Sequence, residues 1–186
     1  MQQFPPIPAW EALHPLIIHF PIVLLLMSPL FIAISAILPP SKGKPFMMTA
    51  IFLLLLGTAS LFIARSTGKE AAKLVEPKGT MGTVLETHRN FASETIIVFS
   101  QLSIILLGIF LLPRILRQRE TRLFSTVLPL TFLAFYLGGI VFLLNTAYTG
   151  SRLVHQLGVH ALISATTGQL AVSPTQANNQ ISDGKH

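Results

Sequence analysis

The sequence from residue 15 to residue 38, PLIIHFPIVLLLMSPLFIAISAIL, decides the fold. These 24 residues include no Asp, Glu, Lys or Arg. A helix of about 20 mostly apolar residues crosses the hydrocarbon core of a bilayer, so the run is long enough to span a membrane. Pro39 and Pro40 follow it, and proline disfavours the continuation of a helix. The run therefore predicts a membrane-spanning helix.

Three more apolar runs lie downstream, at residues 45–64, 91–112 and 123–148. The chain of 186 residues is 51% hydrophobic and only 11% charged, with a mean hydropathy of +0.65. A soluble domain with so little charge could not cover its own surface. The sequence predicts one all-α domain, residues 1–170, built as a four-helix transmembrane bundle in contact with lipid. Residues 171–186 are largely polar, and we expect a disordered tail there.

The connection between the second and third spans carries helix signals. Thr67-Gly68-Lys69-Glu70 has the form of a capping box, in which a Ser or Thr begins a helix and a Glu follows three residues later. We expect a short amphipathic helix from there to Glu76, a break at Pro77-Lys78-Gly79, and a second helical stretch from Thr80 into the third span. Residues 150–170 are mildly apolar, and we expect them on the membrane surface.

The basic residues indicate how the bundle is oriented. Six of them crowd the first and third connections: Lys42, Lys44, Arg114, Arg117, Arg119 and Arg122. Short loops rich in Lys and Arg stay on the cytoplasmic side of a membrane. We therefore expect a multi-pass protein of the bacterial inner membrane with both termini in the periplasm. The net charge of +6 reflects this topology, and we expect no nucleic-acid partner.

Several kinds of chemistry are excluded by composition. The chain has no cysteine, which rules out disulfides, thiolate metal sites, a thiol nucleophile and covalent attachment of a c-type haem. There is no Asp before the tail, no G-x-S-x-G motif and no glycine-rich phosphate loop. The side chains alone make no catalytic set, so any enzymatic reactivity would depend on a cofactor or metal.

The histidines are the candidate functional residues. Threading the four spans places five of them on the predicted periplasmic side: His14, His19, His88, His155 and His160. An imidazole at the headgroup level can be satisfied by water, so each of them alone could be an ordinary interfacial residue. His19 lies about one turn inside an uncharged segment, where a polar ring without a partner is costly, and it therefore needs a partner.

A b-type haem fits this arrangement. Such a haem needs imidazoles on opposing helices, an apolar slot and cations near its propionates. We expect His19 and His88 as axial ligands of the iron, because spans one and three lie diagonally in an up-down-up-down bundle. The remaining histidines, His14, His155 and His160, form a second set, and the cations at the same membrane face are Arg65, Arg89 and Arg152. The expected role is that of a cytochrome-like electron-transport subunit, with other subunits of a redox complex and a quinone as candidate partners.

Two alternatives use the same residues differently. Three imidazoles could hold a zinc or copper ion at the periplasmic face, although no HExxH motif or methionine cluster accompanies them. The chain could also be a cofactor-free structural or assembly subunit of a membrane redox complex, with histidines that only satisfy interfacial hydrogen bonds.

Several motifs resemble one known family. They are Leu13-His14-Pro15 with His19-Phe20-Pro21, Thr67-Gly68-Lys69-Glu70-Ala71, His88, and Gly150-Ser151-Arg152-Leu153-Val154 with Gly158-Val159. Over residues 8–161 the chain resembles the bacterial membrane family catalogued as domain of unknown function 2231. The resemblance implies a four-helix membrane protein, stand-alone or fused to redox modules, with a haem-binding role. Members of that family commonly carry a His directly before the Gly-Val pair, where this chain has Leu157.

Overall fold

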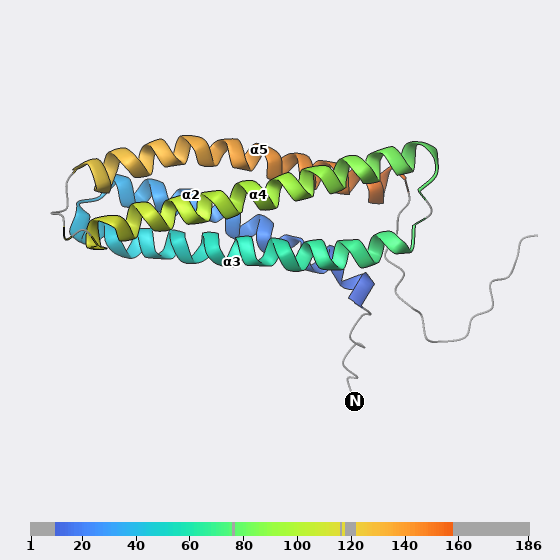
Figure 1. Cartoon of the computed structure of the whole chain (residues 1–186), viewed down its shortest axis with the longest axis horizontal. Helices are drawn as coiled ribbons and strands as arrows, with labels where there is room; N and C mark the ends of the chain where they lie inside the picture. Colours follow the sequence, from blue (N-terminus) through green and yellow to red (C-terminus); the bar gives the residue numbers. More distant parts are fainter. Residues whose placement is uncertain (1–9, 76, 116, 118–121, 158–186) are drawn as a thin grey trace, which may run out of the picture.

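The computed structural model describes residues 10–75, 77–115, 117 and 122–157, and every regular element within them is helical (Figure 1). A 3₁₀ turn, Trp10–Leu13, and a short helix α1, His14–Ile17, lead into the first long helix. The long helices are α2, His19–Ile37; α3, Pro40–Lys73; α4, Gly79–Ile115; and α5, Leu128–His155, which follows a π-helical turn at Leu123–Val127. The all-α prediction is confirmed.

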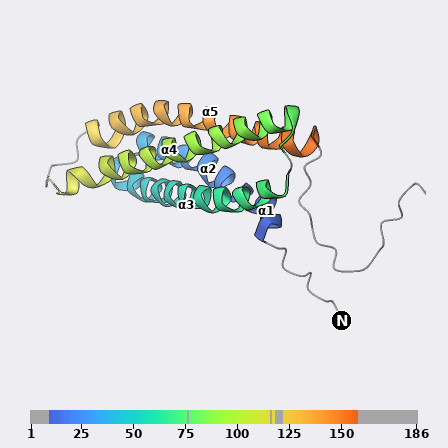
Figure 2. The ribbon, with the colours of Figure 1, turned by 45° about the vertical axis from the view of Figure 1, so that its right-hand side comes forward.

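Four helical stretches are long and apolar enough to cross a membrane, His14–Ile37, Pro40–Lys73, Gly79–Ile115 and Leu123–His155. They lie side by side along the long axis of the molecule (Figures 1 and 2). Large apolar side chains also cover the outside of the bundle, for example Ile104 and Phe135, which are 72% and 70% exposed. Helices that are apolar on the outward as well as the inward face are typical of membrane spans. The predicted four-span bundle is therefore confirmed.

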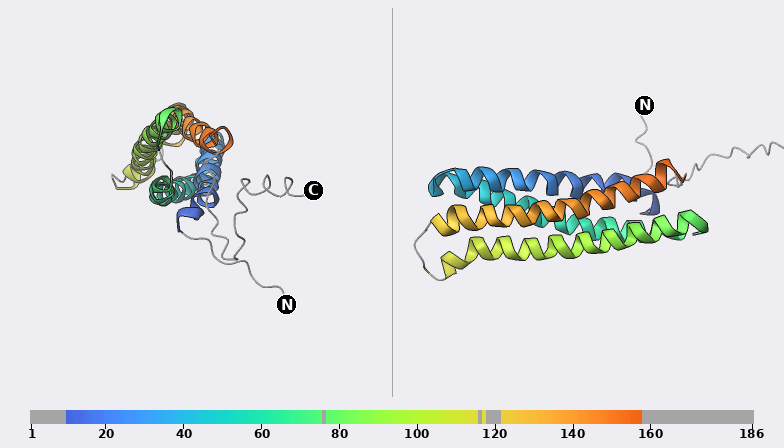
Figure 3. Two further views of the ribbon diagram at one scale, coloured as in Figure 1. Left: turned by 90° about the vertical axis from the view of Figure 1, so that its right-hand side faces the viewer. Right: turned by 90° about the horizontal axis from the view of Figure 1, so that it is seen from above.

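The helices form a ring in which each packs against two neighbours, in the order α2, α3, α4 and α5 (Figure 3). The two sequential pairs, α2 with α3 and α4 with α5, make the most extensive interfaces. The bundle is therefore two helical hairpins side by side, and α2 lies diagonally opposite α4. This arrangement lets residues at the start of α1 and in α4 meet across the bundle axis.

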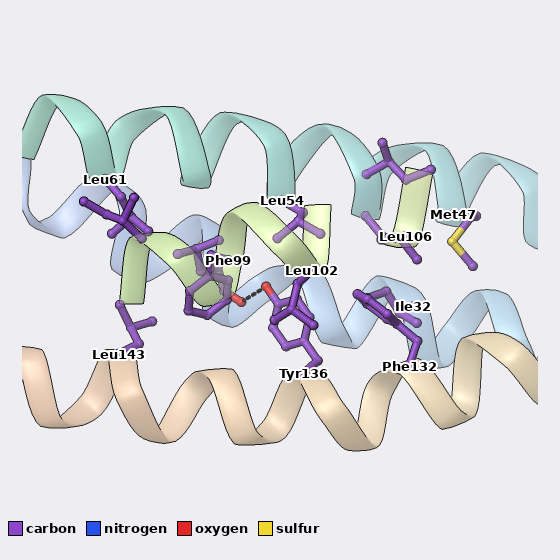
Figure 4. Packing of buried hydrophobic residues seen from close by; sticks show 14 residues of the cluster. Ile32, Met47, Leu54, Leu61, Phe99, Leu102, Leu106, Phe132, Tyr136 and Leu143 are labelled. Carbon is purple, nitrogen blue, oxygen red and sulfur yellow. Dashed lines mark hydrogen bonds between the residues drawn. The ribbon is translucent and has the colours of Figure 1, made fainter. Parts of the chain in front are cut away.

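The middle of the bundle is filled by apolar side chains from all four long helices (Figure 4). Tyr136 is fully buried there, with ring edges packed against Phe99 and Phe132 at centroid distances of 5.5 and 5.9 Å. The Thr58 and Ser103 hydroxyls, 3.0 Å apart, link α3 to α4. Hydroxyl contacts of this kind join helices in membranes, where no water competes for the polar groups.

The predicted helix boundary at Thr67 is wrong. Residues 40–73 form one continuous helix, and Thr67 lies inside it, with a hydroxyl that donates to the carbonyls of Ala64 (3.0 Å) and Ile63 (3.3 Å). The helical segment expected after the second span exists, but it is the last part of α3. The helical stretch expected from Thr80 into the third span is confirmed, since α4 begins at Gly79.

The end of the fourth span also differs from the prediction. Helix α5 continues to His155, so residues 150–155 belong to the bundle and do not form a separate surface segment. The rest of the expected surface segment, residues 158–170, and the expected tail, residues 171–186, lie outside the described residues.

Candidate functional site

A cavity of about 860 Å³ opens at the end of the bundle where α1 begins, α3 and α5 end and α4 begins. Its wall is mostly apolar, with Ile18, Ile22, Leu61 and Leu143 among the lining residues. Four of the predicted histidines also line it, His14, His19, His88 and His155. Cavities of this size and polarity are typical of cofactor and small-molecule sites. The predicted clustering of these four imidazoles at one end of the bundle is therefore what the structure shows.

His14, the first residue of α1, is half-buried against α3. Its Nδ1 atom lies 3.1 Å from the Thr67 hydroxyl oxygen, although 53 positions separate the two residues in sequence. The ring edge faces Gly68, the next residue of α3. His14 is thus held by the second helix of its own hairpin.

His88, in the first part of α4, is half-buried against α5. Its Nδ1–H donates to the Thr146 carbonyl at 3.0 Å, and the Thr149 hydroxyl oxygen lies 3.1 Å from the same nitrogen. The ring edge faces Gly150. A histidine oriented by a carbonyl on Nδ1 has Nε2 left over for another partner, the usual arrangement of a metal-binding imidazole.

His14 and His88 approach the cavity from opposite hairpins. Both rings line it, His14 from α1 and His88 from α4. Within the described part of the chain, neither ring has a hydrogen-bond partner on Nε2. The cavity therefore presents two imidazoles whose Nε2 atoms are available to a ligand.

The other histidines are placed differently. His19 is exposed, and its Nδ1–H donates to the Pro15 carbonyl one turn earlier at 2.8 Å. This bond is the partner that the sequence required for His19. His155 is exposed at the end of α5, and His160 lies outside the described residues.

Two of the three predicted arginines line the cavity. Arg65 and Arg89 are exposed side chains at its wall, together with Lys69. Arg152 is not among the lining residues, and its Nε donates to the Gln156 side chain at 3.0 Å. Among the described lining residues there is no Asp or Glu, so the charged groups around the cavity are all basic.

The sequence interpretation misses the residues that hold the imidazoles. It places Thr67 at a helix start and gives Thr146, Thr149 and Gly150 no part in the site. The available signal is the Thr-Gly pair, which occurs at residues 67–68 and 149–150; a third pair, at residues 167–168, lies outside the described residues.

A metal site with several protein ligands has no support in the described residues, where no group of three or more His, Cys, Asp or Glu side chains is placed to hold an ion. The imidazoles of His14 and His88 remain as candidate ligands. A pair of imidazoles leaves a bare zinc ion short of its usual three or four protein ligands, whereas a haem iron needs only one or two.

The fold and the cavity define a multi-span membrane protein whose four-helix bundle encloses a histidine-lined chamber at one end. The family described as predicted membrane protein (DUF2231) matches residues 11–162, and the chain belongs to this family. Comparisons with curated proteins and with solved structures gave no match.

Proposed function

We propose that this protein binds a b-type haem in the cavity and carries electrons at one face of the bacterial inner membrane. The observation that supports the proposal most directly is the pair His14 and His88, which reach one apolar cavity from opposite hairpins with Nε2 free of hydrogen bonds within the described residues. Imidazoles on facing helices of a bundle are a common way to hold a haem.

The cavity fits the requirements of such a cofactor. The apolar wall suits the porphyrin face and keeps water from the iron ligands. Arg65, Arg89 and Lys69 supply cations for the two propionates without a competing acidic residue among the described lining residues. When bound, the haem would supply one-electron redox chemistry, and the chain would supply binding, orientation and a dry surrounding.

His14 is a better candidate than His19 for the ligand opposite His88. The expectation from sequence pairs His19 with His88, and that pairing stays a prediction. His14 is half-buried and contacts Thr67 of α3 through Nδ1, whereas His19 is exposed. A buried imidazole loses less conformational entropy on binding, since packing already restricts its rotamers.

The proposal also covers the orientation of the protein in the membrane and its partners. The first and third connections carry six basic residues in the sequence, and Lys44 and Arg114 lie at the bundle end opposite the cavity. The positive-inside rule therefore favours a cavity at the periplasmic face and both termini in the periplasm. A quinone or a periplasmic donor and other subunits of a redox complex are the corresponding partners.

The test is a reduced-minus-oxidised spectrum of the protein purified in detergent from haem-sufficient cells, with haem stoichiometry from pyridine extraction. We expect a Soret band and a reduced α-band at about one haem per chain. The variants H14A and H88A should lose or shift both bands, whereas H155A, an exposed imidazole on the same cavity, should keep them.

The same series decides between the two ligand pairs. A spectrum lost in H19A and kept in H14A would restore the pair His19 and His88. Protein without any chromophore would overturn the haem proposal; bound zinc or copper in elemental analysis would then identify an ion-binding protein, and stable co-purification with a complex would identify a structural subunit.

A further inference from the structure

The two Thr-Gly pairs occupy equivalent places in the two hairpins. Thr67 and Gly68 lie near the end of α3, the second long helix of the first hairpin, and Thr149 and Gly150 lie near the end of α5, the second long helix of the other. Each threonine contacts the histidine that stands earlier in its own hairpin, across 53 residues for His14 and 61 residues for His88.

The threonine hydroxyls of the two pairs make matching hydrogen bonds. The Thr67 hydroxyl donates to the carbonyl three residues earlier, Ala64, at 3.0 Å, and the Thr149 hydroxyl donates to Thr146 at the same distance. Each threonine oxygen also lies 3.1 Å from Nδ1 of its histidine, and at His88 the Thr146 carbonyl accepts from the same nitrogen at 3.0 Å. The two sites are therefore two copies of one arrangement.

This arrangement fixes the tautomer of both rings. A threonine hydroxyl has a single hydrogen, and in each copy a helix carbonyl takes it, so the hydroxyl oxygen can only accept from the imidazole. At His88 the Thr146 carbonyl, which can only accept, faces the same nitrogen. These acceptors therefore require a hydrogen on Nδ1, which leaves Nε2 of His14 and His88 without a proton and able to bind a cation or an electrophile.

The glycines set the positions of the rings. A Cβ atom added at Gly68 would come within 2.9 Å of His14 Cε1, and one added at Gly150 within 3.1 Å of His88 Cε1. Each imidazole thus lies against helix backbone, in space that any other residue would occupy. Gly138, also in α5, is a matched control, because a Cβ atom added there would meet no other atom within 4 Å.

We infer that Thr67-Gly68 and Thr149-Gly150 form a duplicated clamp, whose members are positioning residues for two equivalent neutral imidazole donors. The identity of the ligand rests on the proposed function, but the clamp is a property of the ligand-free chain. The ligand class it suits is a haem iron that His14 and His88 would both hold, which would favour electron transfer over binding of small gaseous ligands.

The first experiment needs no haem. The ligand-free protein is labelled with ¹⁵N-histidine in detergent micelles, and the His14 and His88 resonances are assigned with H14Q and H88Q. We expect both rings as the Nδ1–H tautomer. G68A should shift only the His14 signals, G150A only those of His88, and G138A neither. An Nε2–H tautomer at either ring, or a G138A shift as large as that of the other two, would overturn the clamp.

The second experiment uses the haem-loaded protein. An acceptor on Nδ1–H makes an imidazole more basic, which stabilises oxidised iron. T67V should therefore raise the midpoint potential, and T149V should raise it less, because the Thr146 carbonyl still accepts from His88 Nδ1. T67S and T149S should restore the potential, while the low-spin electron paramagnetic resonance signal identifies two imidazole ligands. Unchanged potentials in both valine variants would contradict the positioning role. A chain that binds no haem would fail only this second experiment, so the two proposals are separable.

Discussion

Tyr136 of α5 donates a hydrogen bond that Pro29 of α2 cannot supply. Pro29 lies inside α2 and has no N–H, so the carbonyl of Leu25, four residues earlier, receives no helical hydrogen bond from it. The Tyr136 hydroxyl of α5 donates to that carbonyl at 2.8 Å. In a site without water, an unpaired carbonyl would be costly, and this bond offsets the cost of the proline.

We therefore predict that Y136F lowers the free energy of unfolding by about 1–2 kcal/mol, the usual cost of leaving one buried polar group unpaired. The measurement is reversible unfolding of the purified protein in mixed micelles. The double variant with P29A supplies the missing N–H to the Leu25 carbonyl, so Y136F should cost less in that background. An equal cost in both backgrounds would show that the hydroxyl does not act through this carbonyl.

At the candidate site, the sequence predicts which histidines cluster but not which residues hold them. Clustering of His14, His19, His88 and His155 at one end followed from hydropathy alone, because the spans fix which ends meet. The contact of His14 with Thr67 could not be predicted, since it joins residues 53 positions apart and depends on how two helices pack. The local Thr-x-x-Glu signal at Thr67 pointed instead to a helix start.

At the scale of the helices, the close approach of α2 and α3 sets the geometry of the first hairpin. Gly43, buried near the start of α3, faces the end of α2, and a Cβ atom there would lie 2.6 Å from the Ser35 carbonyl oxygen. Small residues allow helix backbones to approach in membranes, where packing and not the hydrophobic effect drives association. The contact partner is backbone and cannot rotate away.

We predict that G43A destabilises the bundle by about 1–3 kcal/mol, the usual cost of overpacking, despite the higher helix propensity of alanine. G108A, in α4, is the control, because nothing lies within 4 Å of its added methyl group. Unfolding in mixed micelles should show a loss for G43A and no loss for G108A. Equal stability of the two variants would mean that the α2–α3 contact tolerates a methyl group.

Helix lengths show a second limit of sequence-based prediction. The apolar runs located all four spans, but α3 and α4 extend well beyond the predicted ranges of 45–64 and 91–112, to Pro40–Lys73 and Gly79–Ile115. Hydropathy marks only the part of a helix that lipid surrounds. The longer extensions, residues 65–73 of α3 and 79–90 of α4, lie at the cavity end, where packing between helices stabilises them, a tertiary effect that local composition does not encode.

At the scale of the whole molecule, the chamber lies between two hairpins. Each hairpin brings one His–Thr–Gly arrangement to it. Each hairpin contributes one imidazole donor, so neither half forms the site alone. Basic residues lie at both ends of the bundle. Arg65, Lys69 and Arg89 surround the cavity, and Lys44 and Arg114 lie at the other end. The cavity end faces one compartment, which the proposed function takes to be the periplasm.

The absence of cysteine allows a direct test of this orientation. Thr80, at the start of α4 beside the cavity end, and Ser41, at the start of α3, are both exposed and lie at opposite ends of the bundle. A single-cysteine T80C protein should react with a membrane-impermeant maleimide in intact spheroplasts, whereas S41C should react only after lysis, because the positive-inside rule keeps the Lys- and Arg-rich connections in the cytoplasm. Each protein should react fully in detergent, which controls for local accessibility. Reaction of S41C and protection of T80C in intact spheroplasts would place the chamber at the cytoplasmic face and exclude a periplasmic electron donor.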